Sequence, residues 1–126
     1  MASTVTESGA AAAQMQLENY LAGEWYMTIT DPGRVWFIPL FFTRTVDGWT
    51  ARQFVIEDTA WYFRDIVVDA VQSPSDGQWF GRVRMVREMD GLSYSAMLNG
   101  STLMGTYGDK LSYIWKADKC QHGPRQ

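Results

Sequence analysis

The sequence predicts an all-β fold, namely a closed antiparallel β-barrel of about eight strands that follows a single α-helix. From Gly23 onward, short segments alternate apolar with polar residues, which is the pattern of half-buried strands. Asp-Gly and Asn-Gly pairs separate many of these segments, and both pairs tolerate the positive φ angles of tight hairpin turns. A meander of about eight strands can close around one small ligand, and closure leaves no sheet edge exposed.

The turn signals divide the chain after Gly23 into eight strands. The turns are expected at 31–33, 47–48, 74–77, 90–91, 99–100 and 108–109, and the turn near 57–59 is the least marked. The strands are therefore expected at residues 23–30, 35–45, 49–57, 60–72, 78–89, 92–98, 102–107 and 110–117. This assigns residues 23–117 to the barrel and residues 118–126 to a polar tail.

Residues 10–22 are predicted to form the helix. Four consecutive alanines precede Gln, Met, Leu and Glu, all of which favour helix, and Gly23 marks the end. Leu17 and Tyr20 share one face with Ala13. A helix of about three turns is marginal alone, so this face must pack on the barrel. The helix either plugs the barrel or forms a lid over a ligand mouth, and residues 1–9 are expected to be a flexible leader.

Composition excludes several classes of function. The 126 residues indicate one domain, and a net charge of −3 with a pI near 5.0 argues against a nucleic-acid partner. A single cysteine, Cys120, cannot form an internal disulfide and fits a reducing compartment. Because we find neither a secretory signal nor an apolar run of membrane length, we expect a cytoplasmic protein without a membrane partner.

Two strands depart from simple alternation. The strand at 35–42 is apolar on both faces, which indicates that a helix or a second subunit covers its outer side and predicts a homodimer. Pro39 within it cannot donate a ladder hydrogen bond, so we expect a bulge or a break there. In the strand at 60–72 both faces are mixed, and whether Arg64 or Asp65 points inward stays open.

Few residues with conventional catalytic chemistry are present. His122 and Cys120 are single representatives of their types and lie in the polar tail, so we expect them to be solvated. There is no zinc-ligand spacing and no phosphate-binding loop, and we therefore expect neither a metal nor a cofactor. Four polar side chains have inward parity: Gln53, Tyr94, Tyr107 and Tyr113. They either pair with one another or hold a carbonyl or hydroxyl group of a ligand in an aromatic pocket.

Three features carry a resemblance to known proteins. Gly23-x-Trp25 at the start of the barrel, the stretch 98–107 and a closing Trp115 are similar to calycins such as lipocalins and avidins. With its N-terminal helix and no conventional catalytic residues, the chain resembles the small β-barrel cyclases of bacterial spirotetramate and spirotetronate biosynthesis. The resemblance implies dimers whose barrel folds a linear polyene with an acidic dione headgroup. It also implies a [4+2] cycloaddition and an N-terminal segment that closes over the substrate.

On this interpretation the chain is a cofactor-free cyclase. The candidate catalytic residues are Gln53, Tyr94, Tyr107 and Tyr113, which would hydrogen-bond to a carbonyl group of a small hydrophobic polyene. The candidate substrate-binding residues are Leu17, Tyr20, Trp25, Met27, Val55, Trp79, Val83, Met85 and Trp115. Two alternatives remain. The barrel is a non-catalytic carrier of a hydrophobic ligand, or it is a proton-transferring cyclase or isomerase that uses Glu57, Asp65 or Asp69.

Overall fold

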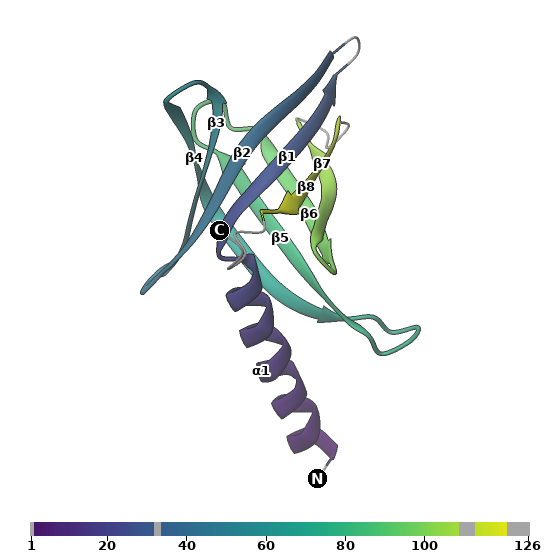
Figure 1. The fold of residues 1–126 in the computed structure, drawn as a ribbon. Helices are drawn as coiled ribbons and strands as arrows, with labels where there is room; N and C mark the ends of the chain where they lie inside the picture. Colours follow the sequence, from purple (N-terminus) through teal and green to yellow (C-terminus); the bar gives the residue numbers. More distant parts are fainter. Residues whose placement is uncertain (1, 32–33, 109–112, 121–126) are drawn as a thin grey trace, which may run out of the picture.

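A computed structural model of the chain describes residues 2–31, 34–108 and 113–120, with side chains for 9–30, 35–108 and 113–120. One helix precedes eight antiparallel strands, and β1 pairs with β8 to close the barrel (Figure 1). The predicted fold class is therefore confirmed. The elements are α1 (Ala2–Leu21), β1 (Gly23–Asp31), β2 (Arg34–Thr45), β3 (Gly48–Ile56), β4 (Thr59–Gln72), β5 (Trp79–Arg87), β6 (Ser93–Asn99), β7 (Thr102–Tyr107) and β8 (Tyr113–Lys119).

The inward face follows the predicted alternation in most strands. In β1, Trp25, Met27 and Ile29 are buried, while Tyr26 between them is exposed. The inward positions of β3, β5, β6, β7 and β8 likewise hold buried residues, including Ala51, Gln53, Val83, Met85, Tyr94, Ala96, Leu98, Leu103, Tyr107, Trp115 and Ala117. These side chains form one continuous apolar core inside the barrel.

A bulge explains why the faces of β4 could not be separated from the sequence. The pairing of β4 with β5 shifts register between Arg64 and Val67, and Asp65 has a positive φ of 53°. An extra residue reverses the parity of the strand. Phe63 therefore points inward before the bulge and Val68 after it, while Arg64 and Asp65 are both exposed.

The expected bulge or break at Pro39 is confirmed on only one side of the strand. Strand β2 is continuous, and Pro39 pairs in register with Tyr26 of β1. On its other side, however, the pairing of β2 with β3 begins only at Leu40, opposite Gln53. Pro39 thus lies where the ladder with β3 stops, a position that requires no donor on that side. The β1–β2 and β3–β4 hairpins diverge beyond this point (Figure 1).

Helix α1 and strand β8 extend beyond their predicted ends, whereas the ends of the other strands lie within two residues of the prediction. Helix α1 begins at Ala2 rather than at residue 10. The stretch before residue 10 contains no proline, and one glycine, Gly9, costs a helix only about 1 kcal/mol relative to alanine. Strand β8 continues to Lys119, two residues into the expected polar tail, because this segment pairs with β1. The predicted start of β8 at 110–112 and His122 lie outside the described residues.

Helix α1 is docked on the barrel through its C-terminal half. Leu17 and Leu21 are buried, and the Gln14 side chain bonds to the backbone of β4, accepting from Ala70 N and donating to Val68 O at 2.8 and 2.9 Å. The indole of Trp25 donates to the carbonyl of Leu21 at 2.8 Å. These contacts fix the helix at the barrel end where β1 begins, while its N-terminal half projects away from the barrel (Figure 1).

Lys119 of β8 ties down the end of the helix. Its ammonium donates to the backbone carbonyls of Tyr20 and Ala22, and it lies 4.9 Å from the centroid of the Tyr20 ring. The last carbonyls of a helix lack intrahelical partners and carry partial negative charge, so a cation there is favourable. Burial lowers the pKa of Lys119. Gly23, with φ of 125°, supplies the turn from α1 into β1 that the sequence indicates.

The outer face of β2 is not covered by the helix. The helix packs on β4 and β5, and on β2 it reaches Arg44, whose guanidinium pairs with Glu18 at 3.3 Å. Outward-pointing Phe37 is 65% exposed, and Val35 and Tyr26 beside it are also exposed. The sequence indicates that either a helix or a second subunit covers the outer side of residues 35–42. The helix is therefore excluded as that cover. Among the described residues, no helix is long and apolar enough to cross a membrane.

Candidate functional site

A cavity of about 190 Å³ opens inside the barrel at the end away from α1. Its walls come from β1 to β7, and no described residue of the helix contributes to them. The cavity lies where β2 and β3 are no longer paired, so the divergence of the two hairpins exposes it to solvent. Its lining is aromatic and aliphatic apart from one cation: Ile29, Trp36, Ile38, Val55, Trp61, Arg87, Tyr94 and Tyr107.

Arg87 is the charged group of this cavity and is only 8% exposed. It is the last residue of β5 and has the inward parity of Met85 and Val83. Its Nη2 donates to Oδ2 of Asp90 at 2.6 Å, and its Nε lies 3.1 and 3.2 Å from the two carboxylate oxygens of the same residue. Asp90 sits in the turn after β5, so a buried cation is balanced by a carboxylate at the barrel rim.

Two inward side chains hold the other side of the guanidinium. Nη1 of Arg87 donates to Oε1 of Gln53 at 2.6 Å and to the hydroxyl of Tyr94 at 3.1 Å. The guanidinium carbon also lies 4.9 Å from the centroid of the Trp61 ring, a cation–π contact. Residues from β3, β4, β6 and the β5–β6 turn therefore hold the guanidinium in one orientation.

The protonation states of this network follow from its contacts. Burial disfavours the charged form of Arg87, but the hydrogen bond to Asp90 and the electrostatic attraction of Tyr94, Asp90 and Tyr107 together outweigh it, so the pKa of Arg87 is raised. The same hydrogen bond lowers the pKa of Asp90. Burial raises the pKa of Tyr94, so its hydroxyl keeps its proton and can still donate it. At neutral pH the network is thus an ion pair with a neutral phenol.

One donor of Arg87 is left for a ligand. A guanidinium has five N–H groups. Nε uses its single N–H on Asp90, Nη2 uses one of two, and Nη1 uses both, on Gln53 and Tyr94. The second N–H of Nη2 has no hydrogen-bond partner among the described residues. A preorganised, charge-assisted donor in an apolar cavity can bind a carbonyl oxygen and stabilise negative charge that develops on it.

The four predicted catalytic residues form a chain of contacts but differ in their exposure to the cavity. Tyr94 and Tyr107 line the cavity and stack with ring centroids 5.0 Å apart. Gln53 is fully buried behind them, and its amide is used on Arg87 and on Sδ of Met27, 3.5 Å away. Tyr113 is 46% exposed at the rim, with its ring 5.4 Å from that of Tyr107. Gln53 is therefore engaged with Arg87 and Met27, and of Gln53 and Arg87 only Arg87 lines the cavity.

The predicted substrate-binding residues fall into three groups. Val55 lines the cavity. A second group consists of buried side chains that pack solidly in the core below it: Trp25, Met27, Val83, Met85 and Trp115. The third group lies at the barrel end that α1 covers, in a groove of about 330 Å³ between α1 and strands β4 to β6: Leu17, Tyr20 and Trp79.

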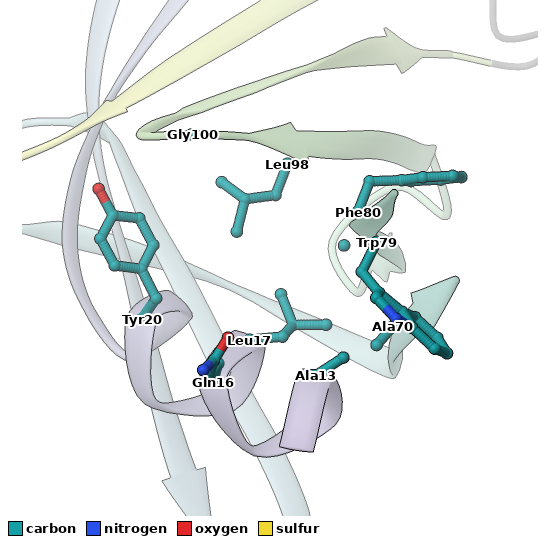
Figure 2. Close-up of a pocket in the computed structure, with 10 residues that line it drawn as sticks. Ala13, Gln16, Leu17, Tyr20, Ala70, Trp79, Phe80, Leu98 and Gly100 are labelled. Atoms are coloured by element: carbon teal, nitrogen blue, oxygen red, sulfur yellow. The ribbon is translucent and has the colours of Figure 1, made fainter. Parts of the chain in front are cut away.

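This groove is the second hollow of the molecule (Figure 2). Leu17 of α1 points across it toward Leu98, and Trp79 and Phe80 form its far side (Figure 2). Leu17 also lies over Gly81, where an added Cβ would come within 2.5 Å of Cδ1 of Leu17. The lining of the groove includes no charged side chain. Compared with this groove, the cavity with Arg87 is therefore the better candidate for a site that orients a ligand.

Arg87 is not among the predicted site residues, although its position in the alternating pattern indicates that its side chain points into the barrel. Arg87 lies two residues after Met85 and four after Val83, on the face predicted to be inward. The aromatic wall residues Trp36 and Trp61 were likewise missed. Trp36 lies on a strand with two apolar faces, and Trp61 precedes the bulge that made the faces of β4 ambiguous.

The remaining candidates have no place in the cavity. Glu57 and Asp65 are exposed, and Asp69 pairs with Arg82 at 3.3 Å outside the barrel. Cys120 was expected to be solvated but is half-buried, and its N–H donates to the carbonyl of Glu24 at 2.9 Å. Burial raises the pKa of its thiol. Within the described part of the chain, no cluster of three His, Cys, Asp or Glu residues could hold a metal ion.

Comparison with known proteins does not assign a family. A scan against protein-family models, a search of curated proteins and a search of solved structures found no match to this chain.

Proposed function

We propose that the barrel binds a small, largely apolar molecule through a carbonyl oxygen at Arg87, and that it acts on this molecule as a [4+2] cyclase. The observation that carries the proposal is the buried guanidinium in an aromatic cavity, with one N–H not used by a described partner. Apolar walls with a few fixed polar groups are typical of ligand sites. A surface arginine of this kind would instead be solvated and mobile.

The chemistry of a cycloaddition suits such a site. In a concerted [4+2] reaction, three π bonds become two σ bonds and one π bond, and no proton passes to the protein. The cavity contributes by holding diene and dienophile close together, an effect worth at most about 7–11 kcal/mol. A hydrogen bond from Arg87 to a carbonyl conjugated with the dienophile draws electron density from the alkene and lowers the barrier further. Tyr94 can add a second, neutral donor.

The size of the cavity limits what it can enclose. Its volume of about 190 Å³ is below the roughly 300–1,000 Å³ of typical ligand pockets. It can hold a carbonyl group and the adjacent carbons, and a longer substrate would extend through the opening between β2 and β3. A compact substrate is therefore the best first test.

The first prediction concerns turnover of such a compound. A linear trienone whose enone is tethered by three methylenes to a terminal diene should be converted to a fused bicyclic ketone of identical mass. Chiral chromatography coupled to mass spectrometry measures both conversion and enantiomeric excess. The reaction without protein gives a racemate, so an enantiomeric excess with protein demonstrates that the cyclisation occurs in the site. Racemic product at the uncatalysed rate would contradict the cyclase proposal.

A carrier is the second candidate function. The observation that favours it is that most polar atoms around the cavity are already paired with one another, as in the Arg87, Asp90, Gln53 and Tyr94 network. Such a site recognises a ligand without reacting with it. The trienone then binds with a measurable dissociation constant but is recovered unchanged. Binding and turnover measured on the same sample therefore separate the carrier from the cyclase.

We also propose that the chain forms a homodimer through the outer face of β1 and β2. Exposed Phe37, Val35 and Tyr26 lie together there, and burial of such a face against a second copy would remove it from water. Sedimentation velocity should show a dimer, and Phe37→Ser should shift it to monomer. Met104, an exposed apolar residue on β7, provides the matched control Met104→Ser, which should remain a dimer. A wild-type monomer at high concentration would contradict this proposal.

A further inference from the structure

We propose that the Arg87–Asp90 pair makes the cavity selective for an uncharged carbonyl oxygen and excludes carboxylates, and that Asp90 is the residue that sets this selectivity. The inference rests on the proposed function, because it assumes that ligands bind at Arg87. It adds the chemical class of the ligand and a residue that lies outside the lining of the cavity.

Neither edge of the Arg87 guanidinium is free for a carboxylate. An arginine usually binds a carboxylate through two parallel N–H groups along one edge of the guanidinium. The edge formed by Nε and Nη2 is occupied by Asp90, at 3.1 and 2.6 Å. Both N–H groups of Nη1 donate to Gln53 and Tyr94, so the edge formed by Nη1 and Nη2 has only one N–H left. A single remaining N–H matches one acceptor oxygen and not the two oxygens of a carboxylate.

The charges of the Arg87–Asp90 pair also disfavour a carboxylate ligand. The charge of Arg87 is already balanced by Asp90, whose carboxylate is held ionised by the same contact. A second carboxylate in the cavity would lose its hydration without gaining a net positive partner, and it would be repelled by Asp90. A ketone or aldehyde carries no net charge, so it does not lose the hydration of an ion and is not repelled by Asp90.

A carboxylate ligand cannot easily replace Asp90 as the partner of Arg87. The carboxylate is only three residues from Arg87 along a tight turn, and its Oδ1 also accepts from the N–H of Leu92 at 3.2 Å. An intramolecular partner has a high effective concentration, of millimolar order or more for short tethers. A free carboxylate at lower concentration therefore does not displace it.

The test compares three phenyl compounds that differ in their polar end. Benzylideneacetone is a neutral ketone, trans-cinnamate at pH 7 is a carboxylate with the same number of non-hydrogen atoms, and trans-β-methylstyrene lacks the polar group. Binding to the wild-type full chain is measured by calorimetry and by quenching of tryptophan fluorescence, since Trp36 and Trp61 line the cavity. The ketone should bind about tenfold or more tightly than the carboxylate.

Asp90→Asn then tests the residue itself. This change keeps the size of the side chain and suits the turn, but it removes the charge that balances Arg87. Cinnamate should gain about tenfold or more in affinity, while the ketone changes by less than about threefold. The control is Asp69→Asn, which removes the carboxylate of a comparable pair with Arg82 outside the barrel and should alter neither ligand.

The outcomes are distinguishable. If none of the three compounds binds the wild type, both the proposed function and this inference fail. If the ketone and the hydrocarbon bind but cinnamate binds the wild type equally well, the inference is overturned and the proposed function stands. Should Asp90→Asn be unstable, as judged by its melting curve, the comparison of ketone and carboxylate on the wild type decides the inference alone.

Discussion

Replacement of Arg87 by methionine is expected to abolish specific binding of carbonyl compounds. Methionine fills similar space along the cavity wall but donates no hydrogen bond. A hydrogen bond from a charged donor is worth about 1.5–3 kcal/mol, which corresponds to a loss of about 10- to 100-fold in affinity for benzylideneacetone. The affinity for trans-β-methylstyrene should stay the same or rise, because the hydrocarbon uses only the apolar walls.

The same substitution should also destabilise the barrel. Gln53 Oε1 and the Tyr94 hydroxyl are buried and would lose the donor that they share. A buried polar group without a partner costs about 1–3 kcal/mol, so the free energy of unfolding should fall by a few kcal/mol. Urea denaturation measures this loss, and binding is compared at a temperature at which both proteins are folded.

Arg82→Met is the matched control. Arg82 lies on the same strand with outward parity, and it pairs with Asp69 at 3.3 Å on the exposed face. Exposed ion pairs contribute about 0–1 kcal/mol, so this variant should unfold like the wild type and bind all three compounds equally. If Arg87→Met also kept its preference for the ketone over the hydrocarbon, Arg87 would not be the group that recognises the carbonyl.

The barrel could be predicted because its strands obey local rules. Alternation in β1, β5 and β6 reflects one buried and one solvated face, and the Asp-Gly and Asn-Gly turns between strands require positive φ angles. Even the least marked turn, between β3 and β4, contains a residue with a positive φ angle, since Asp58 has φ of 61°. Aspartate tolerates this conformation better than most residues, although a glycine signals it more clearly.

The candidate site was harder to predict because it depends on where the regular pattern stops. A bulge at Asp65 reverses the faces of β4, and the pairing of β2 with β3 ends at Leu40. The bulge has no strong local signal, whereas Pro39 marks the point where the pairing of β2 stops but not the cavity beside it. Parity did indicate that Gln53 and Tyr94 are inward, but not that their polar atoms would be used to hold Arg87. That depends on contacts between β3, β5 and β6.

The position of the helix on the barrel could likewise be predicted only in part. Its apolar face could be predicted, but the sequence does not say which end of the barrel it covers. The hypothesis of a lid over the ligand mouth is not supported by the geometry, because α1 docks at the end where β1 begins and the cavity lies at the other end. Leu17 and Leu21 are instead buried beside Trp25, as expected of a plug.

Deletion of residues 1–20 is therefore expected to lower the melting temperature markedly and to leave ligand binding intact in the cold. The deletion removes buried Leu17, the bonds of Gln14 to β4 and the ring of Tyr20, which packs edge-on against Trp25 at 6.0 Å. Loss of one buried leucine alone costs about 2–5 kcal/mol. For a domain of this size that corresponds to a fall of about 10 °C or more.

Deletion of residues 1–12 provides the control. It removes the part of α1 that precedes the contacts of Gln14 and Leu17 with the barrel, so the melting temperature should change by only about 1–2 °C. Both truncated proteins should bind benzylideneacetone at 10 °C within about threefold of the wild type, because distant sites with no shared partners act independently. A lid would give the opposite pair of results. If removal of residues 1–20 left the melting temperature unchanged but weakened binding strongly, α1 would have to reach the cavity during function, and its docked position would be only one of two states.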